Sequence, residues 1–220
     1  MVFCGMLHSL NKIEEDNFDP FNTVPNEQEF PTFQAYGSFK DKIILSNNSI
    51  TATPNSYSPT NDTFVKSLES FILSDYNSIG IEFTIAWDGG RENIYIGFAQ
   101  GFTNKINFTN KVLFHYWITP QTAPSTRDNY AITNNPAWIA GAPADGHDTG
   151  NTMRFKYTQT GSDPTTGKIE IFNVTQSKQW YVIATSGTNA FSTTLATNIV
   201  FYSDSGGGVS DIKFVDVDKI

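Results

Sequence analysis

Short stretches in which apolar and polar residues alternate recur along the chain, separated by clusters of turn-forming residues. This alternation has the period of a β-strand, in which successive side chains point to opposite faces. Thr, Ser, Asn and Gly are abundant between the stretches, and helical spacing is rare. The pattern therefore predicts an all-β, antiparallel sandwich. The predicted strands are DKIILS, NSITAT, KVLFHYWIT, MRFKYTQ, KIEIFNV, QWYVIAT, NIVFYSD and GGGVSDIKFVDV.

The clearest alternation lies between Ile81 and Gly101, on both sides of Gly89-Gly90. Two adjacent glycines suit the positive φ angles of a two-residue hairpin turn. A hairpin with that turn would set the apolar residues of the two runs opposite one another, with Ile81, Phe83 and Ile85 facing Phe98, Ile96 and Ile94. Its other face would be polar, with Glu82, Thr84, Asn93 and Tyr95.

Three segments depart from the strand pattern. The segment 64–73, FVKSLESFIL, has helical spacing and predicts a short helix. The segment 119–151 reads as one long loop, which contains Trp138. Residues 1–33 form a separate arm and linker ahead of a sandwich over 34–220. The arm carries four apolar residues at helical spacing, which would pack either on the chain's own sandwich or on a partner as a docking segment: Phe3, Met6, Leu7 and Leu10.

Charge and composition narrow the function classes. The net charge is −8, so the phosphate backbone of nucleic acid and an anionic membrane surface are both disfavoured partners. No apolar run approaches the roughly 20 residues that a membrane span needs. The single cysteine, Cys4, excludes an internal disulfide. The first residues lack a basic leader, so we predict no signal peptide.

Three segments together resemble the concanavalin A-like, or laminin G-like, jelly-roll family: GSFKDKIILSNNSIT, IEFTIAWDGGRENIYIGFA and VFYSDSGGGVSDIKFVDV. The resemblance covers roughly residues 33–220. It implies two large antiparallel sheets, one with a concave face, and a pairing of the first and last strands. Domains of this kind occur in lectins, carbohydrate-binding modules, glycanases, polysaccharide lyases and phage virion proteins, and the fold alone does not choose among them.

The residues argue against catalysis. Glycanases of this family carry the motif E-x-D-x-x-E on one strand, because a retaining mechanism needs two carboxyl groups about 5 Å apart. Here Glu82 is followed by Thr84 and Ala86, so the motif is absent. A polysaccharide lyase is a less favoured alternative, since His115, Tyr116 and Arg154 supply its residue types without its motif strings.

A glycine-rich loop holds the best candidates for a metal site. Asp145 and Asp148 in PADGHDTGN could bind calcium, although Asp and Gly are also ordinary turn residues. We therefore predict no cofactor, with calcium as the alternative. The predicted ligand-binding residues are Thr84, Asn93, Tyr95, Trp138 and Asp145.

These features together favour a non-catalytic virion structural protein, such as a capsid decoration, head fibre or lectin-like tail domain. It would assemble with other virion proteins and with itself, as a trimer or another symmetric homo-oligomer, and would touch glycans on a host surface. The alternative is a carbohydrate-binding module or lectin, which would be extracellular.

Overall fold

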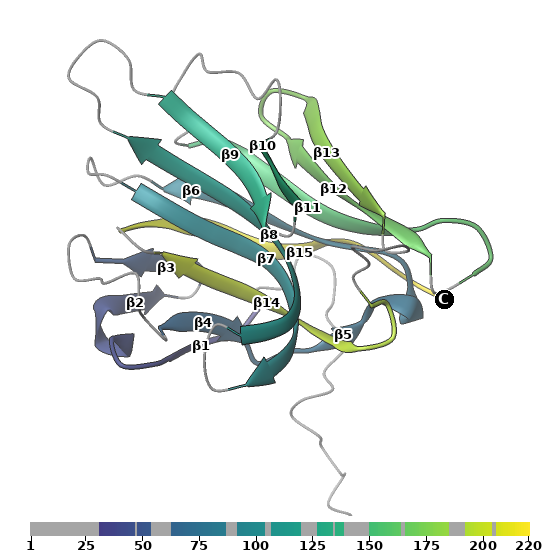
Figure 1. Ribbon diagram of the computed structural model, residues 1–220, viewed down its shortest axis with the longest axis horizontal. Coiled ribbons are helices and arrows are strands. Elements are labelled where there is room, and N and C mark those ends of the chain that lie inside the picture. Colours follow the sequence, from purple (N-terminus) through teal and green to yellow (C-terminus); the bar gives the residue numbers. More distant parts are fainter. Residues whose placement is uncertain are drawn as a thin grey trace, which may run out of the picture.

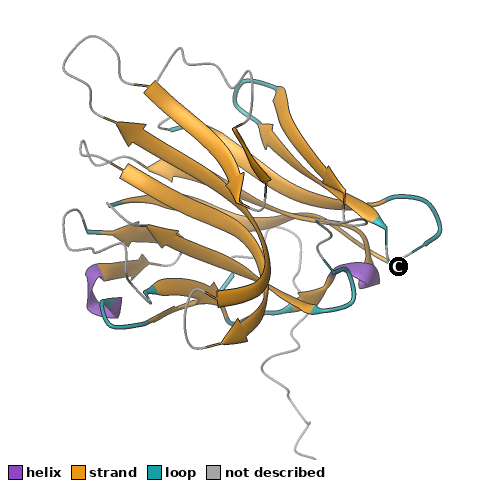
Figure 2. Ribbon diagram, in the orientation of Figure 1, coloured by secondary structure: helices purple, strands orange, loops and turns teal. Residues whose placement is uncertain are grey.

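The computed structural model of the chain describes residues 31–46, 48–53, 63–86, 92–103, 107–119, 127–133, 135–138, 150–163, 166–184, 192–203 and 206–220. Strands dominate this part of the chain, as Figure 2 shows, and confirm the predicted all-β class. Two single-turn 3-10 helices, Lys40–Lys42 and Leu73–Asp75, accompany them. No helix among these residues is long and apolar enough to cross a membrane.

The strands form two antiparallel sheets, here called sheet A and sheet B (Figure 1). Sheet A has the order β1-β4-β14-β7-β8-β9-β10, with β5 attached to β14. Its strands are β1 (Phe33–Tyr36), β4 (Phe64–Ser67), β5 (Phe71–Ile72), β7 (Glu92–Thr103), β8 (Asn107–Thr119), β9 (Arg127–Thr133), β10 (Asn135–Trp138) and β14 (Ala196–Ser203). Sheet B has the order β13-β12-β11-β6-β15-β3-β2. Its strands are β2 (Ile43–Ser46), β3 (Ser49–Ala52), β6 (Tyr76–Ala86), β11 (Thr152–Gln159), β12 (Gly167–Asn173), β13 (Lys178–Ala184) and β15 (Gly207–Lys219).

Alternate residues of both sheets point into the space between them and form one apolar core. Phe83 of β6, Phe98 of β7 and Phe155 of β11 are all fully buried there. The rings of Phe98 and Phe155 meet edge to face across the two sheets, with centroids 4.8 Å apart and planes at 84°. Burying one such side chain contributes about 1.5–3 kcal/mol. The alternation seen in the sequence therefore identifies the core-facing residues correctly.

The predicted hairpin between Ile81 and Phe98 is wrong. Strand β6 pairs with β11 and β15 in sheet B, whereas β7 pairs with β14 and β8 in sheet A. The five residues that join Ala86 to Glu92 can extend over roughly 16 Å, which exceeds the spacing of about 10 Å between packed sheets. The apolar faces of the two strands thus meet across the core instead of along one sheet, and their polar faces lie on opposite sides of the molecule.

The two other irregular segments also contain strands. The predicted helix over 64–73 is wrong, because this segment forms β4, β5 and the start of a 3-10 turn. Val65 pairs with Ala35 of β1 and with Phe201 of β14, so sheet partners override the local helical spacing. The predicted loop over 119–151 contains β9 and β10.

The resemblance implied that the first and last strands pair, and the described strands differ from this: β1 pairs with β4 in sheet A, whereas the last strand, β15, pairs with β6 and β3 in sheet B. Ile50 of β3 lies opposite Val209 of β15 in sheet B. The arm residues Phe3, Met6, Leu7 and Leu10 lie outside the described residues. The predicted division at residue 33 stays a prediction, and the first described strand begins at Phe33.

Tyr76, at the start of β6, should make the fold sensitive to alkali. Burial, reinforced by the negative charge of Asp75, raises the pKa of Tyr76 to about 12. Above pH 10 the unfolded chain loses this proton while the folded chain keeps it. The free energy of unfolding should therefore fall as pH rises from about 10 to about 12, by roughly 1.4 kcal/mol per pH unit from this group. Denaturant unfolding at a series of pH values measures the slope, and Tyr76→Phe should make the slope shallower. An unchanged slope in that variant would contradict the assignment.

Candidate functional site

The predicted ligand-binding residues do not share one face. Thr84 lies in β6 of sheet B, where its hydroxyl is 3.5 Å from that of Thr152. Asn93 and Tyr95 lie in β7 of sheet A, and Trp138 lies in the edge strand β10 of the same sheet. Asp145 lies outside the described residues. The structure thus keeps Asn93, Tyr95 and Trp138 in one sheet and separates Thr84 from them.

Tyr95 belongs to a row of aromatic residues that crosses sheet A at right angles to the strands. Tyr36 of β1 lies opposite Phe64 of β4, and Tyr202 of β14 lies opposite Tyr95 of β7. Strands β4 and β14 are neighbours, and Val65 lies opposite Phe201 in their register. Phe64 and Tyr202 occupy the next position along the two strands. The four residues Tyr36, Phe64, Tyr202 and Tyr95 are called the aromatic row below.

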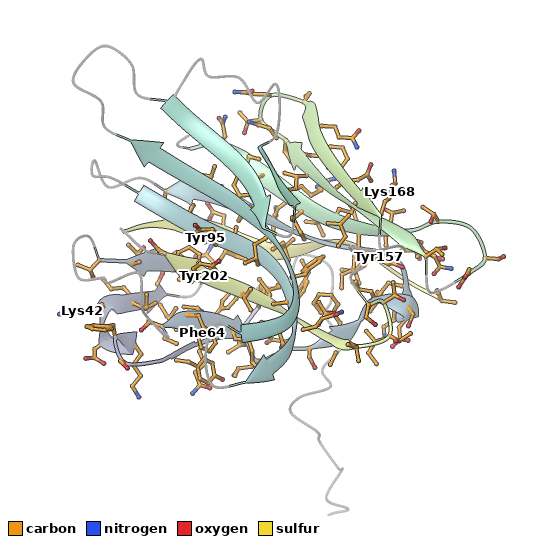
Figure 3. The ribbon with its side chains drawn as sticks, viewed as in Figure 1. Lys42, Phe64, Tyr95, Tyr157, Lys168 and Tyr202 are labelled. Carbon is orange, nitrogen blue, oxygen red and sulfur yellow. The ribbon has the colours of Figure 1, made fainter. Side chains whose placement is uncertain are left out.

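The aromatic row lies on the outer face of sheet A. Its members alternate with residues that pack in the core, such as Val65, Phe201 and Ile94. Figure 3 shows Tyr95 and Tyr202 next to each other, with Phe64 further along the sheet. Side chains of directly opposite residues share a face of an antiparallel pair, so the four members of the row lie on one face of sheet A.

The rings stack in two pairs. The rings of Tyr36 and Phe64 are 5.2 Å apart at 4°, and those of Tyr95 and Tyr202 are 4.2 Å apart at 15°. Phe64 is buried, whereas the three tyrosines are half-buried. Such stacking contributes about 0.5–1.5 kcal/mol per pair beyond burial. The stacking therefore fixes the ring orientations and leaves the tyrosines partly open to solvent.

A small apolar cluster, separate from the main core, supports the tyrosine pair. It consists of Ala99, Leu113 and Val200, none more than 2% exposed, and Tyr95 and Tyr202 pack against it. Since these residues alternate with core residues along β7, β8 and β14, the cluster lies on the outer face of sheet A. The two tyrosine rings are therefore packed against buried apolar side chains of their own sheet.

The backbone register extends the row to the far edge of the sheet. Tyr95 lies opposite His115 of β8, His115 opposite Ala131 of β9, and Ala131 opposite Trp138 of β10. From β1 to β10 this transverse line of backbone positions crosses six strand spacings, about 29 Å at 4.8 Å each. Two residues named from the sequence, Tyr95 and Trp138, therefore occupy positions in one transverse line.

Sequence reasoning missed Tyr36, Phe64 and Tyr202. Each stands in a visible alternating stretch, FQAY, FVKS or NIVFYS. Alternation shows that two residues of one strand share a face, but it does not show which strands are neighbours. Only the strand order β1-β4-β14-β7 brings residues 36, 64, 202 and 95 together.

The outer face of sheet B is ionic. Arg154 of β11 bonds the carboxylate of Glu82 at 2.9 Å and that of Asp216 at 3.2 Å, and Asp216 also pairs with Lys156 at 3.2 Å. Arg154 therefore lies in the other sheet from His115, so the structure separates two of the three residues on which the lyase alternative rested.

A second carboxylate on this face, Glu170 of β12, accepts bonds from Lys168 at 2.8 Å and from Gln179 at 2.7 Å. Strand β11 separates it from Glu82, which puts the two about 10 Å apart in the sheet. Each carboxylate has its own cation. Glu82 and Glu170 thus form two ion pairs, not the close carboxyl pair of a retaining glycosidase.

The described residues contain no group of three or more His, Cys, Asp or Glu side chains that could hold a metal ion. Asp145 and Asp148 lie outside those residues, so calcium binding by their loop stays a prediction.

The chain has no match among protein-family models or among curated protein sequences. Solved structures do resemble it. The VIP36 exoplasmic/lumenal domain in its Ca2+/Man2-bound form superposes with a TM-score of 0.50 and 12% identity, over 90% of this chain and 86% of that one. The Emp46p carbohydrate recognition domain gives 0.49 and 11%, over 84% and 88%. A double mutant of the alginate lyase Aly36B, in complex with an alginate trisaccharide, gives 0.47 and 12%, over 85% and 88%.

At this level of identity the likeness extends to the fold alone. The two antiparallel sheets and the match to the VIP36 domain agree on the fold, which is a concanavalin A-like β-sandwich.

Proposed function

We propose that this protein is a non-catalytic carbohydrate-binding domain whose glycan lies along the aromatic row of sheet A. The observation that carries the proposal is the row itself, with Tyr36, Phe64, Tyr202 and Tyr95 in adjacent strands on one outer face. Asn93 of β7 and Trp138 of β10 extend the proposed surface within the same sheet.

The chemistry of the row suits a sugar. A tyrosine offers both an apolar ring for the C–H groups of a pyranose and a hydroxyl that donates and accepts hydrogen bonds. Tyr95 and Tyr202 are held by their mutual stacking and by the cluster beneath them. Because little side-chain freedom remains to be lost on binding, such a surface is preorganised for a ligand.

The length of the row favours a linear glycan over a single sugar. The row runs across the strands, and its four members span three strand spacings, about 14 Å. Several units of an extended chain would contact the three half-buried tyrosines of the row at once. The fold is consistent with this proposal, since the VIP36 domain that it resembles has a Ca2+/Man2-bound form.

Calcium belongs to the proposal as an accessory ion. The loop that contains Asp145 and Asp148 follows Trp138 in the chain, and carboxylate oxygens are suitable calcium ligands. Binding measured with and without a chelator tests this point separately from the aromatic row.

The main test is a glycan microarray probed with the full chain and with Tyr95→Ala and Tyr202→Ala. Each variant should lose at least about tenfold in affinity for the glycans that bind the wild type, as expected for a buried aromatic contact. Tyr202→Phe keeps the stacked ring and isolates the contribution of the hydroxyl.

Thr84→Ala is the matched control, since Thr84 lies on the opposite sheet and should leave glycan binding unchanged. Equal losses of glycan affinity in Thr84→Ala and Tyr95→Ala would contradict the placement of the binding surface on sheet A. Absence of any glycan signal from the folded wild type would overturn the function, and turnover of a bound polysaccharide would overturn its non-catalytic character.

We propose in addition that the domain is displayed on a virion, with the arm as its attachment. The arm's apolar residues Phe3, Met6, Leu7 and Leu10 support this role, because a short amphipathic segment needs a surface to stabilise it. Deletion of residues 1–33 should abolish incorporation into particles and leave glycan binding intact, and incorporation that survives the deletion would contradict the attachment role.

A further inference from the structure

Strand β2 gives sheet B an apolar free edge. It is the terminal strand of that sheet in the described order, with β3 as its neighbour, and Figure 1 shows it at the margin of the sandwich. Large apolar side chains gather in and next to it: Phe39 is 37%, Ile44 61% and Leu45 36% exposed. Among the large apolar side chains of the described residues, Ile44 is the most exposed after the C-terminal Ile220. An exposed apolar edge of this kind favours pairing with another strand.

The pairing with β3 shows which backbone groups of β2 point to the free edge. The amide of Thr53 donates to the carbonyl of Lys42 at 3.0 Å, so the backbone of Lys42 points toward β3. Hydrogen-bonded and non-hydrogen-bonded positions alternate along an antiparallel pair. In the register of β2 with β3, the backbone groups of Ile44 therefore also point toward β3, and those of Ile43 and Leu45 point toward the free edge.

The features that usually protect an edge strand are missing from β2. Residues 43–46, IILS, include no charged residue and no proline, and their pairing with β3 shows no register shift. The amide of Ile43 donates to the carbonyl of Lys40 in the preceding 3-10 turn. The carbonyl of Ile43 and the amide of Leu45 are thus placed to bond a further strand.

A second copy of β2 fits this edge. In an antiparallel pairing centred on Ile44, a two-fold axis passes between the Ile44 residues of the two copies, and Ile43 of each copy lies opposite Leu45 of the other. The amide of each Leu45 can then donate to the carbonyl of Ile43 in the other copy. The two Ile44 side chains meet at the non-hydrogen-bonded position, where opposite side chains lie closest.

The charges at the two ends of β2 suit the same pairing. The exposed residues Lys40, Asp41 and Lys42 precede the strand and together carry a charge of +1. Beyond its far end, Asn48 donates to the carboxylate of the exposed residue Asp211 at 3.3 Å. Because an antiparallel partner runs in the reverse direction, the basic end of each copy meets the acidic end of the other. Charge complementarity therefore favours a second copy as the occupant of this edge.

We propose that the protein forms a two-fold dimer in which β2 pairs with β2 of a second copy. The pairing joins the two copies of sheet B into one continuous sheet. A four-residue strand supplies far fewer contacts than the roughly 20–30 residues a side of a standard interface, so the dimer is weak, with a Kd on the order of 10 μM.

The dimer would give the proposed glycan binding two sites. The two-fold axis is perpendicular to the joined sheet, so sheet A of both copies lies on the same side of it, and both aromatic rows face the same way. A surface with many glycans could then engage both rows at once, which raises the avidity without any new contact. This consequence rests on the proposed carbohydrate-binding function, whereas the dimer itself does not.

Sedimentation equilibrium of the full chain tests the dimer. The mass should rise with protein concentration from 24.4 kDa toward twice that value. Ile44→Lys would set two ammonium groups next to each other on the two-fold axis and should weaken dimerisation at least about tenfold. Leu45→Pro removes the amide that donates across the edge and leaves the bonds between β2 and β3 in place, so it should weaken dimerisation to a similar extent.

Leu195→Lys is the matched control, because Leu195 is a 44% exposed apolar residue that precedes β14 of sheet A. It should leave dimerisation unchanged. Lys42→Glu and Asp211→Asn should each weaken the dimer about threefold at low salt and less at high salt. Asparagine suits position 211, where the backbone has a φ of 53°. Thermal unfolding of each variant establishes that it is folded.

The outcomes separate the dimer from its role in glycan binding. A mass that stays at 24.4 kDa up to about 0.1 mM, ten times the expected Kd, would overturn the dimer. So would a dimer that the folded variants Ile44→Lys and Leu45→Pro form as well as the wild type, or one that Leu195→Lys weakens equally.

The bivalent role has its own test. Ile44→Lys should reduce retention on a glycan-coated surface at least about tenfold and leave the affinity for a soluble oligosaccharide unchanged. Unchanged retention of this variant, once it is shown to be monomeric, would overturn the bivalent role and leave the dimer in place. If the folded protein binds no glycan, the proposed function fails, and the mass measurement still decides the dimer.

Discussion

Gly208→Ala should destabilise the fold by about 3 kcal/mol, at the upper end of the cost of overpacking a core. Gly208 lies in β15 opposite Thr51 of β3, where a Cβ atom would approach the carbonyl oxygen of Ile50 to 2.4 Å and the Cα of Thr51 to 3.1 Å. Both obstacles are backbone atoms of a paired strand, so no side-chain rotation relieves the contact. The substitution would therefore force apart the pairing of an early strand with the last strand.

Denaturant unfolding with an unchanged m-value measures this cost. Gly161→Ala is the control, because Gly161 has a φ of +76° but no atom within 4 Å of its Cβ position. That variant should lose only the 1–2 kcal/mol, roughly, of left-handed backbone strain. If Gly208→Ala costs no more than Gly161→Ala, then close backbone approach is not what requires glycine at 208.

Arg154→Met should destabilise the protein by roughly 2–3 kcal/mol, somewhat less than the loss of one partner from a fully buried ion pair. Its partner Glu82 has a side chain only 11% exposed, whereas Arg154 itself is 31% exposed. The methionine preserves most of the apolar stem of Arg154. The expected loss therefore comes from leaving the Glu82 carboxylate buried beside β11 without its cation.

A double-mutant cycle with Glu82→Gln tests that cause. The double variant should recover most of the lost stability, because a glutamine amide carries no charge to bury. Denaturant unfolding of the wild type, both single variants and the double variant gives the coupling free energy. Additive losses would mean that Arg154 contributes through packing alone, and would contradict the ionic role assigned to the outer face of sheet B.

The candidate site was only partly predictable. The sequence names Tyr95 and Trp138 as candidate ligand-binding residues, and the backbone register places them at positions of one transverse line. Thr84 was grouped with Tyr95 because both seemed to share the polar face of a hairpin. The pairing of β6 with β11 and β15 puts Thr84 in the other sheet. Tyr36, Phe64 and Tyr202 carried no signal, since each is an unremarkable residue of a short strand.

The sequence by itself determined the all-β class, most of the strands and the residues that face the core. These properties are local, because the two-residue period of a strand assigns each side chain to one face or the other. Met153, Phe155 and Tyr157 of β11 alternate in the sequence and are all buried in the structure.

The tertiary structure alone decided which strands are neighbours and which outer face each polar residue occupies. Alternation is satisfied equally when two apolar strands pair within one sheet and when they pack across two sheets. Strands β6 and β7 take the second arrangement. The aromatic row and the apolar cluster beneath it both follow from contacts between residues far apart in the chain, which no local pattern specifies.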